Sequence, residues 1–499
     1  MSRGRAGLGR PARCGTQRLT TYAALPHTHT HIPHLSPVDA GPGSCARSRP
    51  NHPERNTPMS HRPTSRSRRR AAVTTALATL VPLALAAGCS SQGSAGATTK
   101  DGKVVIPLWT HSAGIEAEMT VQNQIIDDFN SSQDKYEVQQ QEFPQEAYND
   151  SVQGAAAAND LPCVLDVDGP IMPNWAWNGW MVSTGLTDAD VKGFLPSTVG
   201  RYDDEIYSVG YWDATTLMFT LKSTLDKYGI RVPTVDEPWT ADEYAALQQK
   251  IADSGDFNNV VDYGPSWTGE WWSYGFGTFL QSFGGDEIDR DGFESAEGVL
   301  NGPEALEFAT WFQDQFADGY APKSTSPDRT EFLDGKVAIQ FNGNWDYAKN
   351  VEKYGDDLVI APAPDFGNGS VSGAGSWQYG LTKSCSEEQL AGGLDYLRFS
   401  LDDKYIAMYS DATSLIPATS TAAEQTTKGY YGPGEPLEVV TQIAQKYAQV
   451  RPETPAYPVI SQVFEKQLQD IMNGKDPQEG LDQMVSEIDA DLASAGYDN

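Results

Sequence analysis

The chain has 499 residues, of which 67 are acidic and 36 are basic, so its formal net charge is −31. A surface this acidic repels nucleic acid and anionic lipid headgroups, which excludes a basic DNA-binding function. The length is sufficient for two or three domains with cores of their own.

The first 89 residues have a composition that sets them apart from the rest. They contain 13 Arg, no Lys, two acidic residues and six of the seven His, and they show no apolar periodicity before Ala71. A segment of this kind cannot bury a core. We therefore predict that residues 1–89 are a disordered leader that ends in a secretory signal.

The signal is indicated by its charge and hydropathy pattern. Arginines within 66–70 precede an apolar run over 71–88, as in a secretory signal peptide. The last five residues, LAAGC at 85–89, resemble the lipobox of bacterial lipoproteins, with Ala86 where the lipobox more often has Leu. The resemblance implies an exported protein anchored to the membrane by a lipid on Cys89. A single-pass membrane anchor is the alternative, because 18 apolar residues just reach a spanning length.

Beyond the leader the chain has 23 basic and 65 acidic residues, a net charge of −42. Residues 90–102 are rich in Gly, Ser, Ala and Thr and are predicted to form a flexible tether. Cys163 and Cys385 can pair in an exported protein, and two buried free thiols are the alternative. His111 is the only histidine left, so neither a His-based triad nor a multi-histidine zinc site can be assembled. We expect no metal and no cofactor.

Strands and helices alternate from residue 104 onward. Apolar spacing predicts strands over 104–109 and 136–143, helices over 115–130 and 147–159, and a short strand from Leu161. The alternation predicts an α/β fold with a parallel or mixed sheet. Because ligands of such sheets bind beyond the carboxyl ends of the strands, the loops at 110–114 and 166–180 are expected to share one rim.

The segment after the third strand combines carboxylates with indole rings. Asp166 and Asp168 follow its apolar run, and Trp175, Trp177 and Trp180 lie within six residues. We interpret this as a strand end and a loop. Carboxylates bind sugar hydroxyl groups, and indoles stack on the apolar C–H faces of a sugar. The alternative is that the tryptophans are core or lid residues and the aspartates form a turn.

The chain after residue 200 has a recognisable order of elements. A tyrosine-bearing strand at 205–210 leads to an extended segment at 215–221, a short helix that ends in Gly, and a Trp-Thr pair at 239–240 that begins a helix. This order resembles the extracellular solute-binding proteins of carbohydrate ABC importers, the family that includes maltose-binding protein. The resemblance implies that Asp213 is a ligand carboxylate where the chain first crosses between two lobes.

Two further segments carry the same resemblance. Residues 271–277 are similar to the family's aromatic helix, which implies ligand contacts from Trp272 and a ring-stacking position for Tyr274. The strand and turn at 332–345 are similar to the family's segment that ends in a sugar-stacking tryptophan, here Trp345.

The return to the first lobe is expected over 360–375. This crossing would place Trp377 near the floor of a cleft.

The resemblance covers residues 103 to 493 and implies a fold. It is the periplasmic-binding-protein-like fold, of α/β class, with two lobes joined by a multi-segment hinge. Lobe 1 is expected to comprise 103–211 and 376–413, and lobe 2 to comprise 212–375 and 414–499. The expected ligand contacts come from both lobes: Trp109, His111, Asp168, Trp175, Trp177, Asp213, Trp272, Tyr274, Trp345 and Trp377.

The implied function is substrate binding and not enzyme catalysis. A lipoprotein of this family captures a carbohydrate outside the cell and delivers it to the permease subunits of an ABC transporter. The number of aromatic residues favours an oligosaccharide, and we expect a monomer. An exported glycoside hydrolase is the alternative, since Asp166, Asp168, Asp213 and Glu270 could supply the acid and the nucleophile or base that it needs.

Overall fold

The computed structural model describes residues 98–99 and 101–497 of the chain. The predicted signal peptide, its lipid-attachment residue Cys89 and most of the predicted tether lie outside the described residues. Within those ranges, no helix has both the length and the apolar character required to cross a bilayer. The fold is mixed α/β and is built on two seven-stranded sheets, which confirms the predicted fold class.

The first sheet, which we call the sheet of lobe 1, has the strand order β2-β1-β3-β12-β6-β5, with β4 beside β12. β1 runs parallel to β2 and β3, whereas β12 is antiparallel to β3. The carboxyl ends of β1 and β3 therefore share an edge, as the predicted rim requires. The strands are β1 Val104–Thr110, β2 Tyr136–Glu142, β3 Val164–Asp168, β4 Met181–Val182, β5 Val199–Tyr202, β6 Glu205–Val209 and β12 Trp377–Thr382.

The second sheet, which we call the sheet of lobe 2, has the order β14-β11-β7-β9-β8, and β10 and β13 also pair with β7. Nine of the ten residues of β7 are buried, because strands or helices cover it on all sides. The strands are β7 Trp212–Leu221, β8 Asn259–Asp262, β9 Val337–Gly343, β10 Leu358–Ala361, β11 Ser372–Gly375, β13 Ile416–Pro417 and β14 Ala448–Val450.

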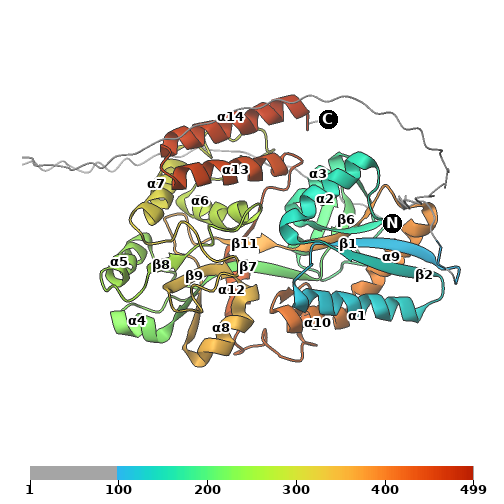
Figure 1. The fold of residues 1–499 in the computed structure, drawn as a ribbon, viewed down its shortest axis with the longest axis horizontal. Helices are drawn as coiled ribbons and strands as arrows, with labels where there is room; N and C mark the ends of the chain where they lie inside the picture. Colours follow the sequence, from blue (N-terminus) through green and yellow to red (C-terminus); the bar gives the residue numbers. More distant parts are fainter. Residues whose placement is uncertain (1–97, 100, 498–499) are drawn as a thin grey trace, which may run out of the picture. The chain divides into compact units, whose positions relative to one another are not determined.

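Helices flank both sheets (Figure 1). Those beside the sheet of lobe 1 are α1 Glu116–Ser132, α2 Gln145–Ala158, η1 Gly169–Ile171, α3 Met172–Trp177, η2 Pro196–Thr198, α9 Glu387–Ser400, α10 Asp403–Thr413 and α11 Ser420–Ala423. Those of lobe 2 are α4 Lys222–Tyr228, α5 Ala241–Ala252, η3 Trp272–Phe276, α6 Gly277–Phe283, α7 Pro303–Ala317, η4 Asn344–Asp346, α8 Tyr347–Tyr354, η5 Gly355–Asp357, α12 Glu438–Tyr447, α13 Tyr457–Met472 and α14 Pro477–Ala495.

The helices form for reasons that are visible in the sequence. In α1, the buried residues Val121, Ile125 and Phe129 recur every four positions and so face the core of lobe 1. α5 begins with a capping box, in which the Thr240 hydroxyl accepts a hydrogen bond from the backbone N–H of Glu243 and the Glu243 carboxylate accepts one from Thr240.

Two sequence-based boundaries were wrong. The predicted loop at 166–180 is mostly regular structure, because β3 continues to Asp168 and η1 and α3 follow, each with a proline in its first turn. The return crossing is also much shorter than the predicted span of 360–375. β10 and β11 both pair with β7 inside lobe 2, so the chain crosses between Gly375 and Trp377.

Three of the segments that pass between the sheets lie side by side. They connect β6 to β7, β11 to β12 and α10 to β13. β7 pairs with β11 at Ala214 and Thr215 and with β13 at Trp212 and Asp213, so all three passages meet at the first residues of β7 (Figure 1). This arrangement is a multi-segment hinge. The boundaries of the lobes outside the strands stay a prediction.

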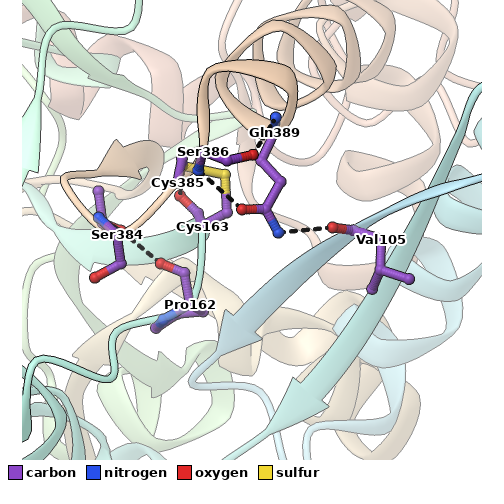
Figure 2. Close-up of a disulfide and its surroundings, with 8 residues drawn as sticks. Val105, Pro162, Cys163, Ser384, Cys385, Ser386 and Gln389 are labelled. Atoms are coloured by element: carbon purple, nitrogen blue, oxygen red, sulfur yellow. Dashed lines mark hydrogen bonds between the residues drawn. A yellow bond between two sulfur atoms is a disulfide. The ribbon is translucent and has the colours of Figure 1, made fainter. Parts of the chain in front are cut away.

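A disulfide joins Cys163, just before β3, to Cys385, shortly after β12 (Figure 2). The two residues are 222 positions apart in the sequence. The neighbouring backbone is held as well, since the N–H of Thr382 donates to the carbonyl oxygen of Cys163 over 3.0 Å. The disulfide therefore fastens β3 to β12 at the end of the ladder opposite to Asp168 and Trp377, which pair at its other end.

Candidate functional site

A buried polar cluster lies at the carboxyl edge of the sheet of lobe 1. His111, which follows β1, is 2% exposed, and its Nδ1 lies 2.6 Å from Oδ2 of Asp166 in β3. Its Nε2 lies 3.8 Å from Oε2 of Glu118, and its ring stacks on Trp377 with the ring centres 3.8 Å apart. Burial alone lowers the pKa of His111, but the charge and the hydrogen bond of Asp166 outweigh it, so the pKa is raised overall. The carboxyl ends of β1 and β3 therefore meet at the predicted rim, where Asp166 stabilises the protonated form of the histidine.

An ion pair next to this cluster connects the two lobes. Asp168 is the last residue of β3, and Arg451 follows β14 of the other sheet. The guanidinium binds the carboxylate through two hydrogen bonds, Nη1 to Oδ2 and Nη2 to Oδ1, both 2.7 Å long. Both side chains are buried. A bidentate pair of this kind fixes the relative direction of the two groups as well as their distance.

The same guanidinium binds a second carboxylate. Nη1 of Arg451 lies 3.0 Å from Oε2 of Glu270, which also accepts a hydrogen bond from the Tyr457 hydroxyl. Burial raises the pKa of Glu270, and the charge of Arg451 opposes that rise. The Nε of Arg451 has no hydrogen-bond partner among the described residues. Asp168 and Glu270 thus both accept hydrogen bonds from Arg451, whose Nε–H group remains without a partner among the described residues.

Aromatic rings from lobe 2 complete the site. Tyr274 belongs to η3, a π-helical turn, and its ring lies 5.0 Å from the guanidinium carbon of Arg451. The Trp345 ring lies 6.1 Å from that of Tyr274, centre to centre, and packs against the hydrophobic cores of both lobes. A π-helical turn in a helix is frequent at functional sites because it redirects side chains.

Two glycines make this arrangement possible. A Cβ atom at Gly343 would lie 2.0 Å from the Trp345 ring, and one at Gly373 would lie 2.7 Å from the carbonyl oxygen of Tyr274. Neither distance is tolerable for a side chain, so both backbones can approach the rings only because they carry none.

Asp213 lies in the hinge. Its Oδ1 accepts hydrogen bonds from the backbone N–H groups of Ala214 and Gly375, and its Oδ2 accepts one from the Ser197 hydroxyl. Burial raises the pKa of Asp213 to about 6. Because Gly375 belongs to β11 and Asp213 to β7, this carboxylate joins two of the three passages between the lobes.

These groups together suit a neutral ligand with hydroxyl groups and apolar faces. Carboxylates and the free Nε of Arg451 can exchange hydrogen bonds with hydroxyl groups, and the rings of Tyr274 and Trp345 can stack on C–H faces. Among the described residues, no three or more His, Cys, Asp or Glu side chains are grouped in a way that could hold a metal ion.

Residues 124–430 match the family of bacterial extracellular solute-binding proteins, which is more than half of the chain. This chain belongs to that family. The match ends before Arg451 and Tyr457, so it does not include all of the groups described above.

Solved structures of other solute-binding proteins share the fold. The cyclic alpha-maltosyl-1,6-maltose binding protein of Arthrobacter globiformis is 21% identical, with 78% of this chain and 99% of that chain aligned and a TM-score of 0.64. The GacH receptor of Streptomyces glaucescens is 20% identical over 78% and 98%, with a TM-score of 0.65. The MalE domain of Bdellovibrio bacteriovorus, solved with maltotriose, is 18% identical over 78% and 100%, with a TM-score of 0.66. At this identity the likeness establishes the two-lobed fold.

Two tryptophans of the solute-binding protein are not where the sequence placed them. Trp175 is 1% exposed in the core of lobe 1, and Trp272 is fully buried in the core of lobe 2, where its indole N–H donates to the carbonyl oxygen of Trp267. Both indoles belong to hydrophobic cores, as in the alternative considered for Trp175, and their contact with a ligand stays a prediction. Trp175 was misplaced because the segment was taken for a loop, whereas α3 turns its side chain inward.

Two other predicted contacts lie at the periphery. Trp177 is partly exposed and packs edge-on against Tyr497, with the ring centres 4.9 Å apart. Trp109 packs on Phe143, with the ring centres 4.6 Å apart, at the margin of the lobe 1 core. The structure brings the other predicted residues together, namely His111, Asp168, Asp213, Tyr274, Trp345 and Trp377, and their contact with a ligand stays a prediction.

The sequence did not reveal Arg451 and Tyr457. Arg451 is separated by 283 positions from Asp168 and by 181 from Glu270, so no local pattern connects them. The one available signal was the rarity of basic residues, since only 23 stand against 65 acidic residues beyond residue 89.

The carboxylates considered for a hydrolase are all engaged. Asp166 binds His111, Asp168 and Glu270 bind Arg451, and Asp213 binds the hinge backbone. A glycosidase needs one carboxylic acid and one free carboxylate that face each other across the substrate. The observed pairings supply no such couple, and the family match is to binding proteins.

Proposed function

We propose that this protein captures a neutral carbohydrate outside the cell and passes it to the permease subunits of an ABC transporter. The observation that carries the proposal is the meeting of Asp168 from lobe 1 with Arg451, Glu270, Tyr274 and Trp345 from lobe 2. Polar groups and flat rings placed together match the hydroxyl edges and apolar faces of a sugar.

The proteins of similar fold support the same class of ligand. The first is named for cyclic alpha-maltosyl-1,6-maltose, and the other two were solved with acarbose and with maltotriose. With 18 to 21% identity, the identity of the sugar does not transfer. We propose an oligosaccharide, because rings from several elements surround the site and one monosaccharide would cover few of them.

The hinge supplies the means of capture. A ligand favours closure only if it binds the closed state better than the open one, which requires contact with both lobes. Asp168 and Trp377 belong to one sheet, and Tyr274 and Trp345 belong to the other lobe. A saccharide that touches both sets would therefore hold the lobes together, and the closed form would be the one presented to the permease.

We further propose that the protein is a monomer held at the outer face of the cytoplasmic membrane by a lipid on Cys89. The LAAGC pattern at 85–89 and the Gly- and Ser-rich tether after it support this anchor. Substituting Cys89→Ala should release the protein into the medium or the soluble fraction, which detergent phase partitioning would detect. A variant that remains in the membrane phase would contradict the anchor.

A thermal-shift screen tests the function. The purified protein from residue 90 onward is heated with neutral di- to tetrasaccharides of maltose, mannose and cellulose type, each at about 0.1 mM, a hundredfold excess over a micromolar Kd. A micromolar ligand at a hundredfold excess adds about 2.7 kcal/mol of stability. Reducing ends are measured afterwards, and we expect the sugar to remain intact. Release of new reducing ends would show a hydrolase, and no shift with any sugar would overturn the proposal.

A further inference from the structure

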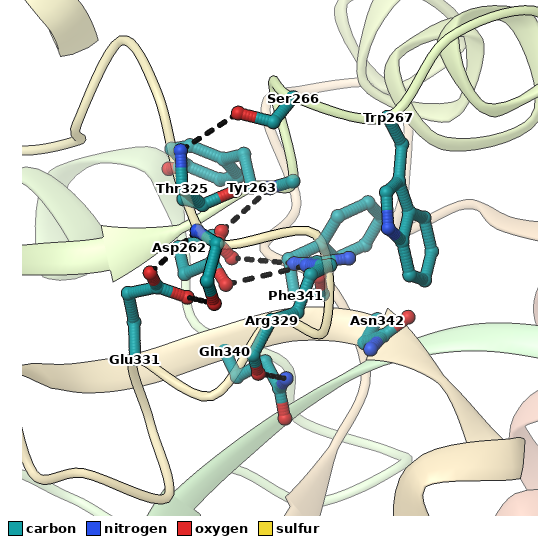
Figure 3. Close-up of polar contacts among 12 residues, drawn as sticks. Asp262, Tyr263, Ser266, Trp267, Thr325, Arg329, Glu331, Gln340, Phe341 and Asn342 are labelled. Carbon is teal, nitrogen blue, oxygen red and sulfur yellow. Dashed lines mark hydrogen bonds and ion pairs between the residues drawn. The ribbon is translucent and has the colours of Figure 1, made fainter.

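A fully buried arginine lies behind the aromatic part of the site. Arg329 is 1% exposed, and its Nε donates to Oδ2 of Asp262, the last residue of β8, over 3.2 Å. Its Nη2 donates to the carbonyl oxygens of Asp262, over 3.2 Å, and Phe341, over 2.6 Å (Figure 3). β8 and β9 run parallel, so one guanidinium ties together the carboxyl ends of both strands.

The third nitrogen of this guanidinium faces rings. Nη1 of Arg329 has no hydrogen-bond partner among the described residues. The guanidinium carbon lies 4.7 Å from the ring centre of Trp267 and 5.1 Å from that of Trp271. A desolvated cation is attracted to the faces of indole rings. Gly264, with a φ of +70°, leaves room for the group, since a Cβ there would lie 2.6 Å from Nη1.

One of the two rings beside Arg329, that of Trp271, is in contact with the site. Trp271 lies edge-on to Trp345, with the ring centres 6.4 Å apart, and at the same distance from Tyr274. The indole N–H of Trp271 is fixed by the carbonyl oxygen of Tyr263 over 3.0 Å. Phe341, whose carbonyl binds Arg329, precedes Trp345 by four residues. Arg329 therefore restrains both the ring beside Trp345 and the strand that leads to it.

We propose that Arg329 is a positioning residue for the ligand site, which acts by fixing the orientation of Trp345. It does not touch the ligand itself. The inference rests on the proposed function, because it assumes that Trp345 stacks on a saccharide. Stability alone is a weak reason for such a group, since desolvation offsets most of the attraction in a buried ion pair. The contacts of Arg329 are better suited to fix the orientation of the neighbouring rings than to increase the free energy of unfolding.

A double-mutant cycle tests this inference. The variants Arg329→Lys, Trp345→Ala and the double variant are titrated with the di- to tetrasaccharide of maltose, mannose or cellulose type that gives the largest thermal shift. Lys keeps the charge but cannot bind both strand ends and two rings at once. We expect Arg329→Lys to lower affinity about 3- to 10-fold, in line with the loss of a desolvated cation–π contact. In the Trp345→Ala background the same change should have no further effect.

Several outcomes would overturn the inference. Additive losses would mean that Arg329 acts independently of Trp345, and unchanged affinity in Arg329→Lys would mean that it positions nothing. Leu481→Ala, a buried change in α14 of the same lobe, controls for a general loss of stability and should leave affinity within about 2-fold. An equal loss of affinity in that variant would also overturn the inference.

A second variant covers the case in which Arg329→Lys does not fold. Trp271→Phe removes part of the ring that faces Trp345, and its effect on affinity should likewise vanish in the Trp345→Ala background. If no saccharide stabilises the wild-type protein, the proposed function fails, and this inference fails with it. If the wild type binds but the losses are additive, only this inference fails.

Discussion

The carboxyl edge of the lobe 1 sheet and the facing part of lobe 2 differ in chemistry. Lobe 1 presents ionisable groups, with His111 between Asp166 and Glu118 and with Asp168 beside them. Lobe 2 presents aromatic rings, including Tyr274 and Trp345, with their support buried behind them. The division is not complete, because Trp377 lies in lobe 1 and Arg451 and Glu270 lie in lobe 2. A saccharide that contacts both lobes would meet most of the acids from one side and most of the rings from the other, so recognition and closure would depend on the same event.

The two buried arginines of the described residues differ in which lobes their partners belong to. Arg451 joins Asp168 of lobe 1 to Glu270 of lobe 2, and so belongs to the boundary between the lobes. Arg329 binds only partners within lobe 2. Substitution of Arg451 should therefore affect both the free energy of unfolding and the closure of the lobes. Substitution of Arg329 should affect the orientation of the rings of Trp271 and Trp345.

The largest effect is expected from Arg451→Met, which breaks the connection between the lobes. The variant leaves Asp168 and Glu270 buried without a cation, and a broken buried pair typically costs about 3 to 5 kcal/mol. Urea unfolding followed by tryptophan fluorescence would measure the loss, and saccharide binding should become undetectable. Arg451→Lys keeps the charge and should fall between this variant and the wild type. A loss below about 1 kcal/mol in Arg451→Met would show that the pair contributes little.

A somewhat smaller effect is expected from removal of the disulfide, which belongs to lobe 1 alone. Replacing Cys163 and Cys385 together by Ser should lower the free energy of unfolding by about 2 to 4 kcal/mol, because the reduced unfolded chain is less constrained. Saccharide affinity should change little, since hydrogen bonds between β3 and β12 still set the register of Asp168 and Trp377. The reduced wild type serves as the control. A large loss of affinity would mean that the disulfide sets the geometry of the rim.

The role of the lobe 2 rings is tested by comparing two tryptophans. Trp345→Ala should lower saccharide affinity roughly 10- to 100-fold, as expected for loss of a stacked ring and its buried area. Trp272→Phe changes a core indole and should lower stability while leaving affinity nearly unchanged. Isothermal titration and thermal unfolding of both variants separate the two quantities. Equal affinity losses would contradict the assignment of Trp345 to the site and Trp272 to the core.

The sequence predicted those parts of the fold that depend on local pattern. Apolar spacing located β1, α1, β2 and α2, and the order of segments around Tyr274 and Trp345 indicated the family. The rim was also predicted, because parallel strands end at one edge, and the contact of His111 with Asp166 confirms it.

The rest depended on information that is not local. Trp175 and Trp177 are two residues apart in one short helix, and their composition gave no sign that the first enters the core and the second stays partly exposed. Arg451 gains its role from partners 283 and 181 residues away. Aromatic residues identified the type of site, but only the packing shows which rings face the boundary between the lobes.

The smallest effect is expected from Glu287, a buried acid of lobe 2. Asp168 forms an ion pair with Arg451, whereas Glu287 forms none among the described residues. It is 2% exposed, and burial raises its pKa to about 7. Because the folded state holds this proton more tightly than the unfolded state, its contribution to stability is present below about pH 4.5 and is lost as the pH rises through 7. A shift of this size corresponds to at most about 3 kcal/mol, and relaxation around the buried charge should reduce it to about 1 kcal/mol.

Glu287→Gln, which mimics the protonated acid, should therefore equal the wild type near pH 4.5 and exceed its stability at pH 8. Urea unfolding at both pH values measures the difference, and Glu307→Gln, at an exposed position of α7 in the same lobe, serves as a control. A difference that is the same at both pH values would show that Glu287 does not titrate in this range.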